Sequence, residues 1–283
     1  MRQLKRRAAK QTKKRSPQMF KKRFIGVVAL LALVLAGCQA EQTTTHKPTQ
    51  TTTTHKQTKA TTTLSNKTFK SGDKPYLVVN HNKSTLDVRQ WQTERIKYGA
   101  LDDLNRTTTN TAYLSHDTLG RSNTRERQNW RPTGWHNQPV MIDGHRVIPQ
   151  NRGHLIAYAI SFNFDEDGVF KKGQLGSSDN PKNLATQTEF SNQRTMQIFE
   201  DQVRQALIRH KKVIYQVTTV FRGSELMPRG YWVQAISTDK TLNFNAYVWN
   251  VEPKMQFDYA TGRGRVDQTM KVADYYPGNR YTK

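Results

Sequence analysis

The sequence predicts an α+β fold in which a long helix packs against a central antiparallel sheet. Three runs late in the chain alternate apolar with polar residues and are rich in Val, Tyr, Phe and Trp, as antiparallel strands are. They cover residues 212–221, 231–237 and 241–251. Before them, an apolar stripe with spacings of three and four residues indicates a helix within residues 191–210, formed by Phe199, Val203, Ala206 and Leu207. A helix with one apolar face buries it against another element, so we expect this helix on the sheet.

The middle of the chain is less regular. Residues 75–80 predict a first strand, and residues 140–148 predict another strand that contains a turn at Asp143-Gly144. Residues 100–137 are polar and rich in Thr, Asn and Arg, and residues 163–181 are rich in Gly, Asp and Lys. Both compositions are typical of loops with short elements.

The first 38 residues have the layout of a bacterial secretion signal. A basic region precedes an apolar run over residues 24–37, which is shorter than the roughly 20 residues that span a bilayer. The run ends in Leu35-Ala36-Gly37-Cys38, which resembles a lipobox whose cysteine is lipidated after cleavage. We therefore expect a signal peptide with a lipobox over residues 1–38. An ordinary signal peptide and an uncleaved anchor, each with an incidental cysteine, stay open as alternatives.

Residues 39–63 predict a disordered, threonine-rich spacer. The run Thr-Thr-Thr-His-Lys occurs at 43–47 and again at 52–56, without the apolar residues that a core needs. We expect one folded domain over residues 64–283. Because Cys38 is the only cysteine of the chain, an internal disulfide framework and a CxxC zinc site are excluded.

The net charge indicates a polyanionic partner. The chain carries +23, of which 11 cations lie in the first 23 residues, and the rest of the chain retains an excess of +12. A folded domain with this excess attracts polyanions over about one Debye length or more. Nucleic acid and anionic cell-wall polymers both fit.

One short run could carry chemistry: Asn151-Arg152-Gly153-His154. A histidine in such a run is on its own as well explained by a structural role at the end of a strand. Its significance depends on a second segment, Asn180 to Gln193, which leads into the predicted helix and is followed by Glu200. The eight residues from Asn192 to Glu200 turn an α-helix by roughly 800°, which leaves the two side chains roughly 80° apart on one side.

With these two segments the sequence resembles the DNA/RNA non-specific endonucleases of the ββα-metal type, in particular the DNA-entry and secreted nucleases of Gram-positive bacteria. The resemblance covers most of residues 75–260. It implies a ββα-metal catalytic motif in which His154 is the general base and Asn192 binds the metal. It also implies that Glu200 orders the water around the metal, that Arg152 lies near the phosphate and that Asn183 supports the site.

Asn151 departs from the family pattern, which has aspartate at this position. The amide keeps one acceptor oxygen but lacks the charge, which bears on rate and on metal affinity. The chemistry is otherwise coherent. An imidazole can take a proton from water near neutral pH, and Mg²⁺ prefers oxygen ligands and keeps several waters. We expect Mg²⁺ as the cofactor, with Mn²⁺ as a substitute.

A basic stretch before the motif could follow the nucleic-acid backbone. It comprises Arg121, Arg125, Arg127 and Arg131, with Trp130 and Trp135 nearby as stacking surfaces. A solvated loop beside two core tryptophans explains the same residues equally well. The resemblance implies that one of these arginines reaches the scissile phosphate, and we assign this role to Arg127.

Three functions are therefore compared. The first is a sugar-non-specific endonuclease that acts on DNA and RNA, either at the cell surface, anchored through Cys38, or secreted. The second is a surface lipoprotein that has the nuclease fold and binds nucleic acid without cutting it, which only Asn151 favours. The third is an adhesin for anionic wall polymers, favoured only by the charge and the anchor. His154, Asn192 and Glu200 together favour the nuclease, and no protein partner is evident.

Overall fold

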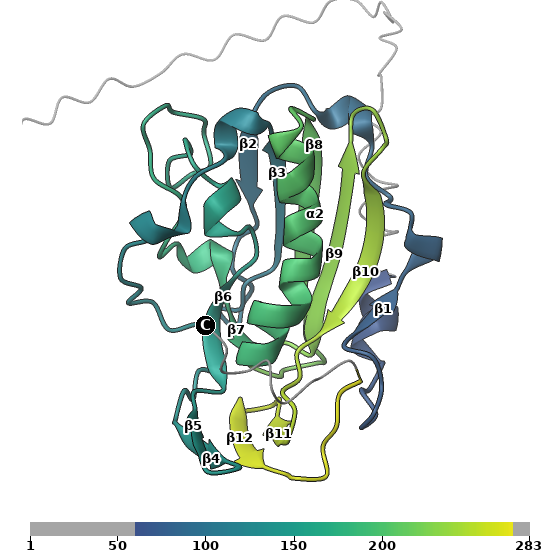
Figure 1. Cartoon of the computed structure of the whole chain (residues 1–283), viewed down its shortest axis with the longest axis vertical. Helices are drawn as coiled ribbons and strands as arrows, with labels where there is room; N and C mark the ends of the chain where they lie inside the picture. Colours follow the sequence, from purple (N-terminus) through teal and green to yellow (C-terminus); the bar gives the residue numbers. More distant parts are fainter. Residues whose placement is uncertain (1–59, 274–283) are drawn as a thin grey trace, which may run out of the picture. The chain divides into compact units, whose positions relative to one another are not determined.

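A six-stranded antiparallel sheet forms the centre of the fold in this computed structural model, which describes residues 60–273 (Figure 1). Its strand order is β1-β10-β9-β8-β3-β2, and every neighbouring pair is antiparallel. The strands are β1 (Tyr76–Val78), β2 (Arg95–Tyr98), β3 (Thr109–Leu114), β8 (Val213–Val220), β9 (Gly230–Ser237) and β10 (Asn243–Trp249). The predicted α+β class with a central antiparallel sheet is confirmed.

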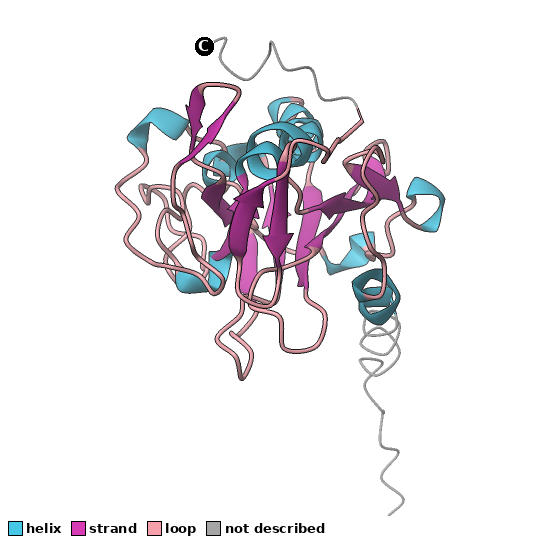
Figure 2. Ribbon diagram, turned by 90° about the horizontal axis from the view of Figure 1, so that it is seen from below, coloured by secondary structure: helices cyan, strands magenta, loops and turns pink. Residues whose placement is uncertain are grey.

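Helix α2 (Gln197–Ile208) lies along one face of this sheet (Figures 1 and 2). Its predicted stripe is buried, and it packs in one cluster with sheet residues such as Tyr215, Val217 and Val233. Burying one such side chain fully contributes about 1.5–3 kcal/mol, so the stripe fixes the helix on the sheet. The predicted helix over 191–210 is α-helical only from Gln197; its first turn is the π-helix η7 (Ser191–Met196).

Three two-stranded ribbons complete the strands. Strand β6 (Gln150–His154) pairs with β7 (Leu184–Thr188), β4 (Val140–Ile142) with β5 (His145–Val147), and β11 (Met255–Asp258) with β12 (Arg263–Val266). The β4–β5 and β11–β12 ribbons share one apolar cluster, formed by Ile142, Val147, Met227, Met255 and Phe257. The strand predicted over 140–148 is thus a hairpin around its predicted turn.

Short 3₁₀ helices occupy many connections. They are η1 (Asn80–Asn82), η2 (Val88–Gln90), η3 (His116–Thr118), η4 (Ser122–Thr124), η5 (Tyr158–Ile160) and η6 (Pro181–Asn183). Across residues 60–273 no helix combines the length and the apolar character that crossing a membrane requires.

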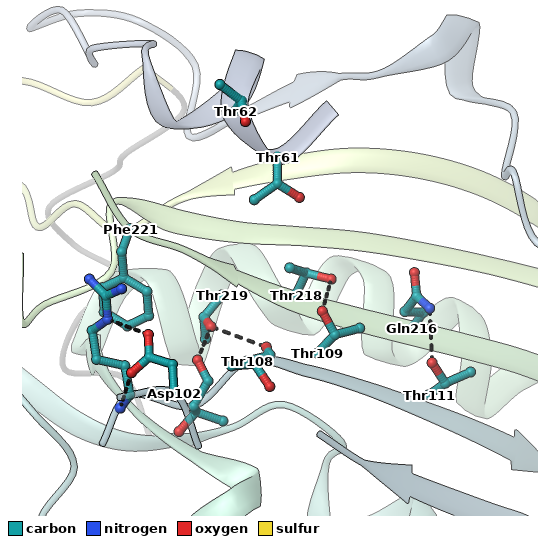
Figure 3. A pocket seen from close by; sticks show the side chains of 12 residues that line it. Thr61, Thr62, Asp102, Thr108, Thr109, Thr111, Gln216, Thr218, Thr219 and Phe221 are labelled. Atoms are coloured by element: carbon teal, nitrogen blue, oxygen red, sulfur yellow. Dashed lines mark hydrogen bonds and ion pairs between the residues drawn. The ribbon is translucent and has the colours of Figure 1, made fainter. Parts of the chain in front are cut away.

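The face of the sheet that turns away from α2 carries a threonine-lined hollow of about 520 Å³ (Figure 3). Its hydroxyl and amide groups pair with one another: Thr109 and Thr218 are joined at 2.9 Å, and Gln216 donates to Thr111 at 2.8 Å. These polar side chains of the hollow are therefore hydrogen-bonded to one another. The residues of the predicted site lie on the other side of the sheet.

Strand β3 corrects the prediction that residues 100–137 are loops. Thr109 and Thr111 face the threonine-lined hollow, while Ala112 and Leu114 face the core, so only half of the strand is apolar. Asn110 is fully buried, and its amide donates to the Lys182 carbonyl and to Asn183. A buried polar residue with partners far along the chain gives no local signal of a central strand.

The start of the folded part also differs from the prediction. Residues 60–65 are helical, and Ala60 and Leu64 pack on the cluster that contains Trp249, so residues 60–63 belong to the domain rather than to the spacer. The predicted signal peptide and lipobox over 1–38, with Cys38, and the spacer over 39–59 lie outside the described residues.

Candidate active site

The motif run lies within a strand. Asn151, Arg152 and His154 belong to β6, which pairs with β7 in the register Asn151↔Gln187 and His154↔Leu184. Beyond Thr188 the chain runs through two residues into η7 and then α2. Two antiparallel strands followed by a helix are the β–β–α arrangement that the resemblance implied.

The His154 side chain is held in one tautomer. It is only 8% exposed, and its Nε2 atom lies 3.0 Å from the backbone oxygen of Ser178. A carbonyl oxygen can only accept, so Nε2 carries the proton and Nδ1 keeps its lone pair. The ring is thus arranged to accept a proton at Nδ1.

The surroundings of His154 keep it neutral. Burial and, to a smaller extent, the positive charge of Arg125 lower its pKa to about 4, against the opposing effects of hydrogen bonds to the carbonyls of Ser178 and Ser177 and of the charge of Asp179. A neutral imidazole near pH 7 is the form that a general base requires.

Glu200 lies in the first turn of α2 and is partly buried. Burial and, to a smaller extent, the charge of the neighbouring Asp201 raise its pKa to about 7, against the opposing effect of the positive charge of Arg125. Perturbed pKa values in neighbouring groups are typical of functional sites. Arg125 acts on both His154 and Glu200, so the three side chains share one electrostatic environment.

Asn192 is the second residue of the π-helix η7 and is partly exposed. A π turn closes its hydrogen bonds five residues apart and is frequent at functional sites. It turns the chain less per residue than an α-helix does, so the angle of roughly 80° that we expected between Asn192 and Glu200 does not hold.

Gln187 connects β6, the strand that carries His154, to the π turn. Nothing in the sequence alone identifies Gln187 as a residue of the site. Its side chain is fully buried, and Nε2 donates to Ser191 Oγ at 3.0 Å, directly before Asn192. Its Oε1 lies over Gly153, where a Cβ atom would approach it to 2.1 Å. The side chain therefore crosses β6 at the one residue that leaves room for it.

Asn183 holds the segment that follows His154. It is fully buried, its Oδ1 accepts from the Ile156 N–H at 2.9 Å, and its Nδ2 donates to the Ile156 carbonyl at 3.0 Å. The same Oδ1 accepts from Asn110 in the central sheet at 3.0 Å. Asn151 differs, because its Nδ2 is buried and has no hydrogen-bond partner among the described residues.

Arg152 is fixed on a tryptophan. Its Nε donates to the Trp130 carbonyl at 2.5 Å, and its guanidinium lies 4.6 Å from the centre of the Trp135 ring. With Nε and one face occupied, the two terminal nitrogens form a fork that suits a phosphate group.

Arg125, in the preceding loop, acts on the site through its charge. Its guanidinium lies 5.2 Å from the centre of the Tyr158 ring, and its charge affects both His154 and Glu200. Arg127 is exposed and is not among the charges that act on either residue.

The donor set fits an oxygen-preferring cation. Within residues 60–273 no three His, Cys, Asp or Glu side chains gather as a metal cluster. The oxygen donors that the predicted site residues offer are the Asn192 amide and the Glu200 carboxylate. A small hard cation that keeps most of its waters needs no more protein ligands than these.

Comparisons with known proteins identify the family and the fold. The sequence profile of the DNA/RNA non-specific endonuclease family matches residues 83–239. The NucA structure from Streptococcus agalactiae with magnesium bound shares 29% identity at a TM-score of 0.60 over 75% of this chain and 95% of its own. The metal-free NucA structure shares 27% identity at a TM-score of 0.59 over 77% and 98%. The Sda1 nuclease with bound zinc, at 21% identity and a TM-score of 0.53 over 66% and 95%, has the same fold.

Proposed function

Since the chain belongs to the DNA/RNA non-specific endonuclease family and is a nuclease, we propose that it hydrolyses internal phosphodiester bonds of both DNA and RNA, with His154 as the general base and Mg²⁺ as the cofactor. The observation that carries this proposal is the hydrogen bond from His154 Nε2 to the Ser178 carbonyl, which leaves Nδ1 as the proton acceptor. No contact to a base or a 2′-hydroxyl is required.

The reaction follows from the side chains. His154 Nδ1 accepts a proton from a water molecule as that water attacks phosphorus, and the bond to the 3′-oxygen breaks, with the departing oxygen taking a proton from solvent water. The Arg152 fork and the Arg125 guanidinium offset the negative charge that grows on the phosphate oxygens. Glu200, when ionised, accepts hydrogen bonds from water and holds it in place.

Asn192 and Glu200 would hold the divalent cation. When bound, Mg²⁺ polarises the phosphate and stabilises the departing oxygen. The Asn192 amide oxygen is its direct ligand in this proposal, and Mn²⁺, which accepts similar oxygen ligands, would substitute for it.

A cleavage assay tests the proposal. The full chain is incubated with plasmid DNA and with ribosomal RNA, in Mg²⁺, in Mn²⁺ or in EDTA. We expect loss of both substrates with either metal and none in EDTA. If neither substrate is cut in Mg²⁺ or Mn²⁺, the catalytic proposal is wrong.

One observation favours a second function, a surface protein that binds nucleic acid without cutting it. Asn151 replaces the aspartate of the family, and its Nδ2 is left without a partner among the described residues. A gel-shift assay in EDTA separates the two functions, because the second predicts binding without cleavage when Mg²⁺ is restored. An adhesin for wall polymers predicts neither binding nor cleavage of nucleic acid.

We also propose that the nuclease is displayed at the cell surface through a lipid on Cys38. The support is the apolar run that ends in Leu35-Ala36-Gly37-Cys38. The change Cys38→Ser should move the protein from the membrane fraction to the medium, and an unchanged distribution would contradict lipidation.

A further inference from the structure

The β11–β12 ribbon is attached to the strand that carries the general base. Gln150 is the first residue of β6 and His154 the last. The Gln150 Nε2 donates to the Gly262 carbonyl, in the turn of the ribbon, at 2.7 Å, and its Oε1 accepts from the His136 N–H at 2.7 Å. Because Gln150 is almost fully buried, its hydrogen bond holds the backbone of the ribbon in place.

Two glycines make the attachment close. Gly262 has a φ of +83°, and a Cβ atom there would lie 1.9 Å from the Gly134 carbonyl oxygen. Gly134 directly precedes Trp135, whose ring supports the Arg152 guanidinium at 4.6 Å. A continuous path therefore leads from Arg152 through Trp135 and the two glycines to Arg263, the residue after Gly262.

Strand β12 presents two arginines to solvent. Arg263 and Arg265 are exposed and alternate with Gly264 and Val266, which face the side of the ribbon where Met255 and Phe257 are buried. Both guanidinium groups therefore lie on the side turned away from the apolar cluster.

The charge of Arg265 contributes to lowering the pKa of Asp267, but within residues 60–273 neither β12 arginine is held in a salt bridge. Asp258, paired with Arg263 in the register, instead accepts from the Ala260 N–H at 3.0 Å and the Thr261 hydroxyl at 2.7 Å. Arg265 donates to the amide oxygen of Gln256. The positive charge of β12 is therefore available to a partner.

We propose that Arg263 and Arg265 bind the phosphate backbone of the substrate strand beyond the site of cleavage. Gln150 lies four residues from His154 on β6, about 13 Å at roughly 3.3 Å per residue. At the rise of about 3.4 Å per nucleotide of a stacked strand, the point where the ribbon is attached lies about four nucleotides from His154. The two arginines are roughly 6.6 Å apart along β12, the rise of about two nucleotides.

Nucleic acid is the occupant that the observations favour. The arginines carry the charge that phosphates attract, and their ribbon is connected through Gly134 and Trp135 to Arg152, the arginine proposed to lie near the scissile phosphate. This inference rests on the proposed nuclease function and adds a minimum substrate length to it.

A length series tests the proposal. The full chain and its double variant Arg263→Ala/Arg265→Ala are compared on single-stranded DNA of about 4, 8, 16 and 40 nucleotides, between about 50 and 200 mM NaCl in Mg²⁺. For the wild type we expect kcat/KM to rise once the strand extends beyond about four nucleotides from the cleaved bond. The double variant should lose about tenfold on the longest strand and little on the shortest that the wild type cuts. In a plot of log kcat/KM against log salt concentration, the slope of the double variant should be shallower than that of the wild type by about 1.4. Each phosphate contact to a single strand contributes about 0.7 to this slope.

Matched variants separate charge from folding. Arg263→Lys/Arg265→Lys should retain most of the long-strand activity. Lys83→Ala/Lys240→Ala removes two exposed charges elsewhere on the domain and should cut every length as the wild type does. Equal loss at every length, or no loss on the longest strand, would overturn the proposal. Failure of the wild type to cut any strand would instead contradict the nuclease function, so the two results are distinct.

Discussion

His154 Nε2 and the backbone oxygen of Ser178 are 3.0 Å apart, and this hydrogen bond determines which ring nitrogen can act as a base. Removing the ring by His154→Ala should lower kcat by about 10²–10⁴-fold, the contribution that a positioned general base makes. Plasmid nicking under saturating Mg²⁺ measures the loss. His116→Ala is the control, because His116 stacks on His210 and takes no part in the site. Undiminished cleavage by His154→Ala would show that another group is the base.

The buried imidazole also makes stability depend on pH. The unfolded chain protonates this histidine near pH 6.5, whereas burial and Arg125 lower the pKa to about 4 in the folded protein. Between these values the unfolded state binds more protons, so stability falls as the pH drops from 6.5 towards 4. The loss is on the order of 3 kcal/mol at most.

Urea unfolding in EDTA measures this effect. The wild type is compared with His154→Gln at pH 7 and at about pH 4, so that the opposing titration of Glu200, whose pKa is raised to about 7, is common to both proteins. The difference in unfolding free energy should change with pH in the stated direction. Parallel pH dependences would contradict the assignment.

The sequence was sufficient to predict those parts of the fold that depend on local periodicity. Strands β8, β9 and β10 and the stripe of α2 follow from alternation and from spacings of three and four. Strand β3 could not be predicted in this way, since Asn110 is buried through partners about 70 residues away. The β11–β12 ribbon is also unpredicted, because Arg263–Val266 is exposed on both faces and has no apolar period.

Some residues of the candidate site could likewise be predicted from the sequence, and others could not. His154, Asn192 and Glu200 were selected by motif and resemblance, and the structure places them on the β6–β7–helix unit. Gln187 and the Ser178 carbonyl could not be selected, because one acts through packing over Gly153 and the other through its backbone. The π turn at Asn192 also gives no signal in the composition of Ser191–Met196.

Arg125 and Arg127 should differ in their effects on cleavage. Arg125→Gln removes the charge that lowers the pKa of His154, so that pKa should rise, and loss of phosphate charge stabilisation should lower kcat roughly 10²-fold. Arg127→Gln, with no charge effect on the site, should leave both nearly unchanged. An NMR titration of the His154 ring and a kinetic assay check the two quantities. Equal effects of the two substitutions would contradict the choice of Arg125.

Asn151→Asp should strengthen metal binding. The buried Nδ2 of Asn151 has no acceptor among the described residues, and an oxygen in its place adds negative charge near the cation site. We expect the Mg²⁺ concentration for half-maximal cleavage to fall by roughly tenfold, the scale on which groups around a ligand shell act. Asn180→Asp is the control, because Asn180 caps a loop helix through its Oδ1. An unchanged Mg²⁺ dependence would show that the charge at residue 151 does not act on the cation.

The contact between Gly153 and Gln187 gives the most specific test of the β6–β7 ribbon. A methyl group at residue 153 would lie 2.1 Å from Gln187 Oε1 and 2.7 Å from Gln187 Cβ. Gln187 cannot move away easily, because it is fully buried and bound to Ser191. Gly153→Ala should therefore destabilise the protein by about 1–3 kcal/mol through overpacking.

The same substitution should reduce cleavage further than the loss of stability explains, since it moves the strand that ends at His154. The double variant Gly153→Ala/Gln187→Gly removes both close contacts by transferring the glycine across the ribbon. The double variant should lose less stability than the two single variants lose together. The difference should be about 1 kcal/mol or more, the scale of coupling between residues in contact. The kcat of the double variant should stay low, because the bond from Gln187 to Ser191 beside Asn192 is lost. Additive stabilities would mean that Gln187 does not occupy the space above Gly153, whereas recovery of both stability and kcat would mean that Gln187 does not position the Asn192 turn.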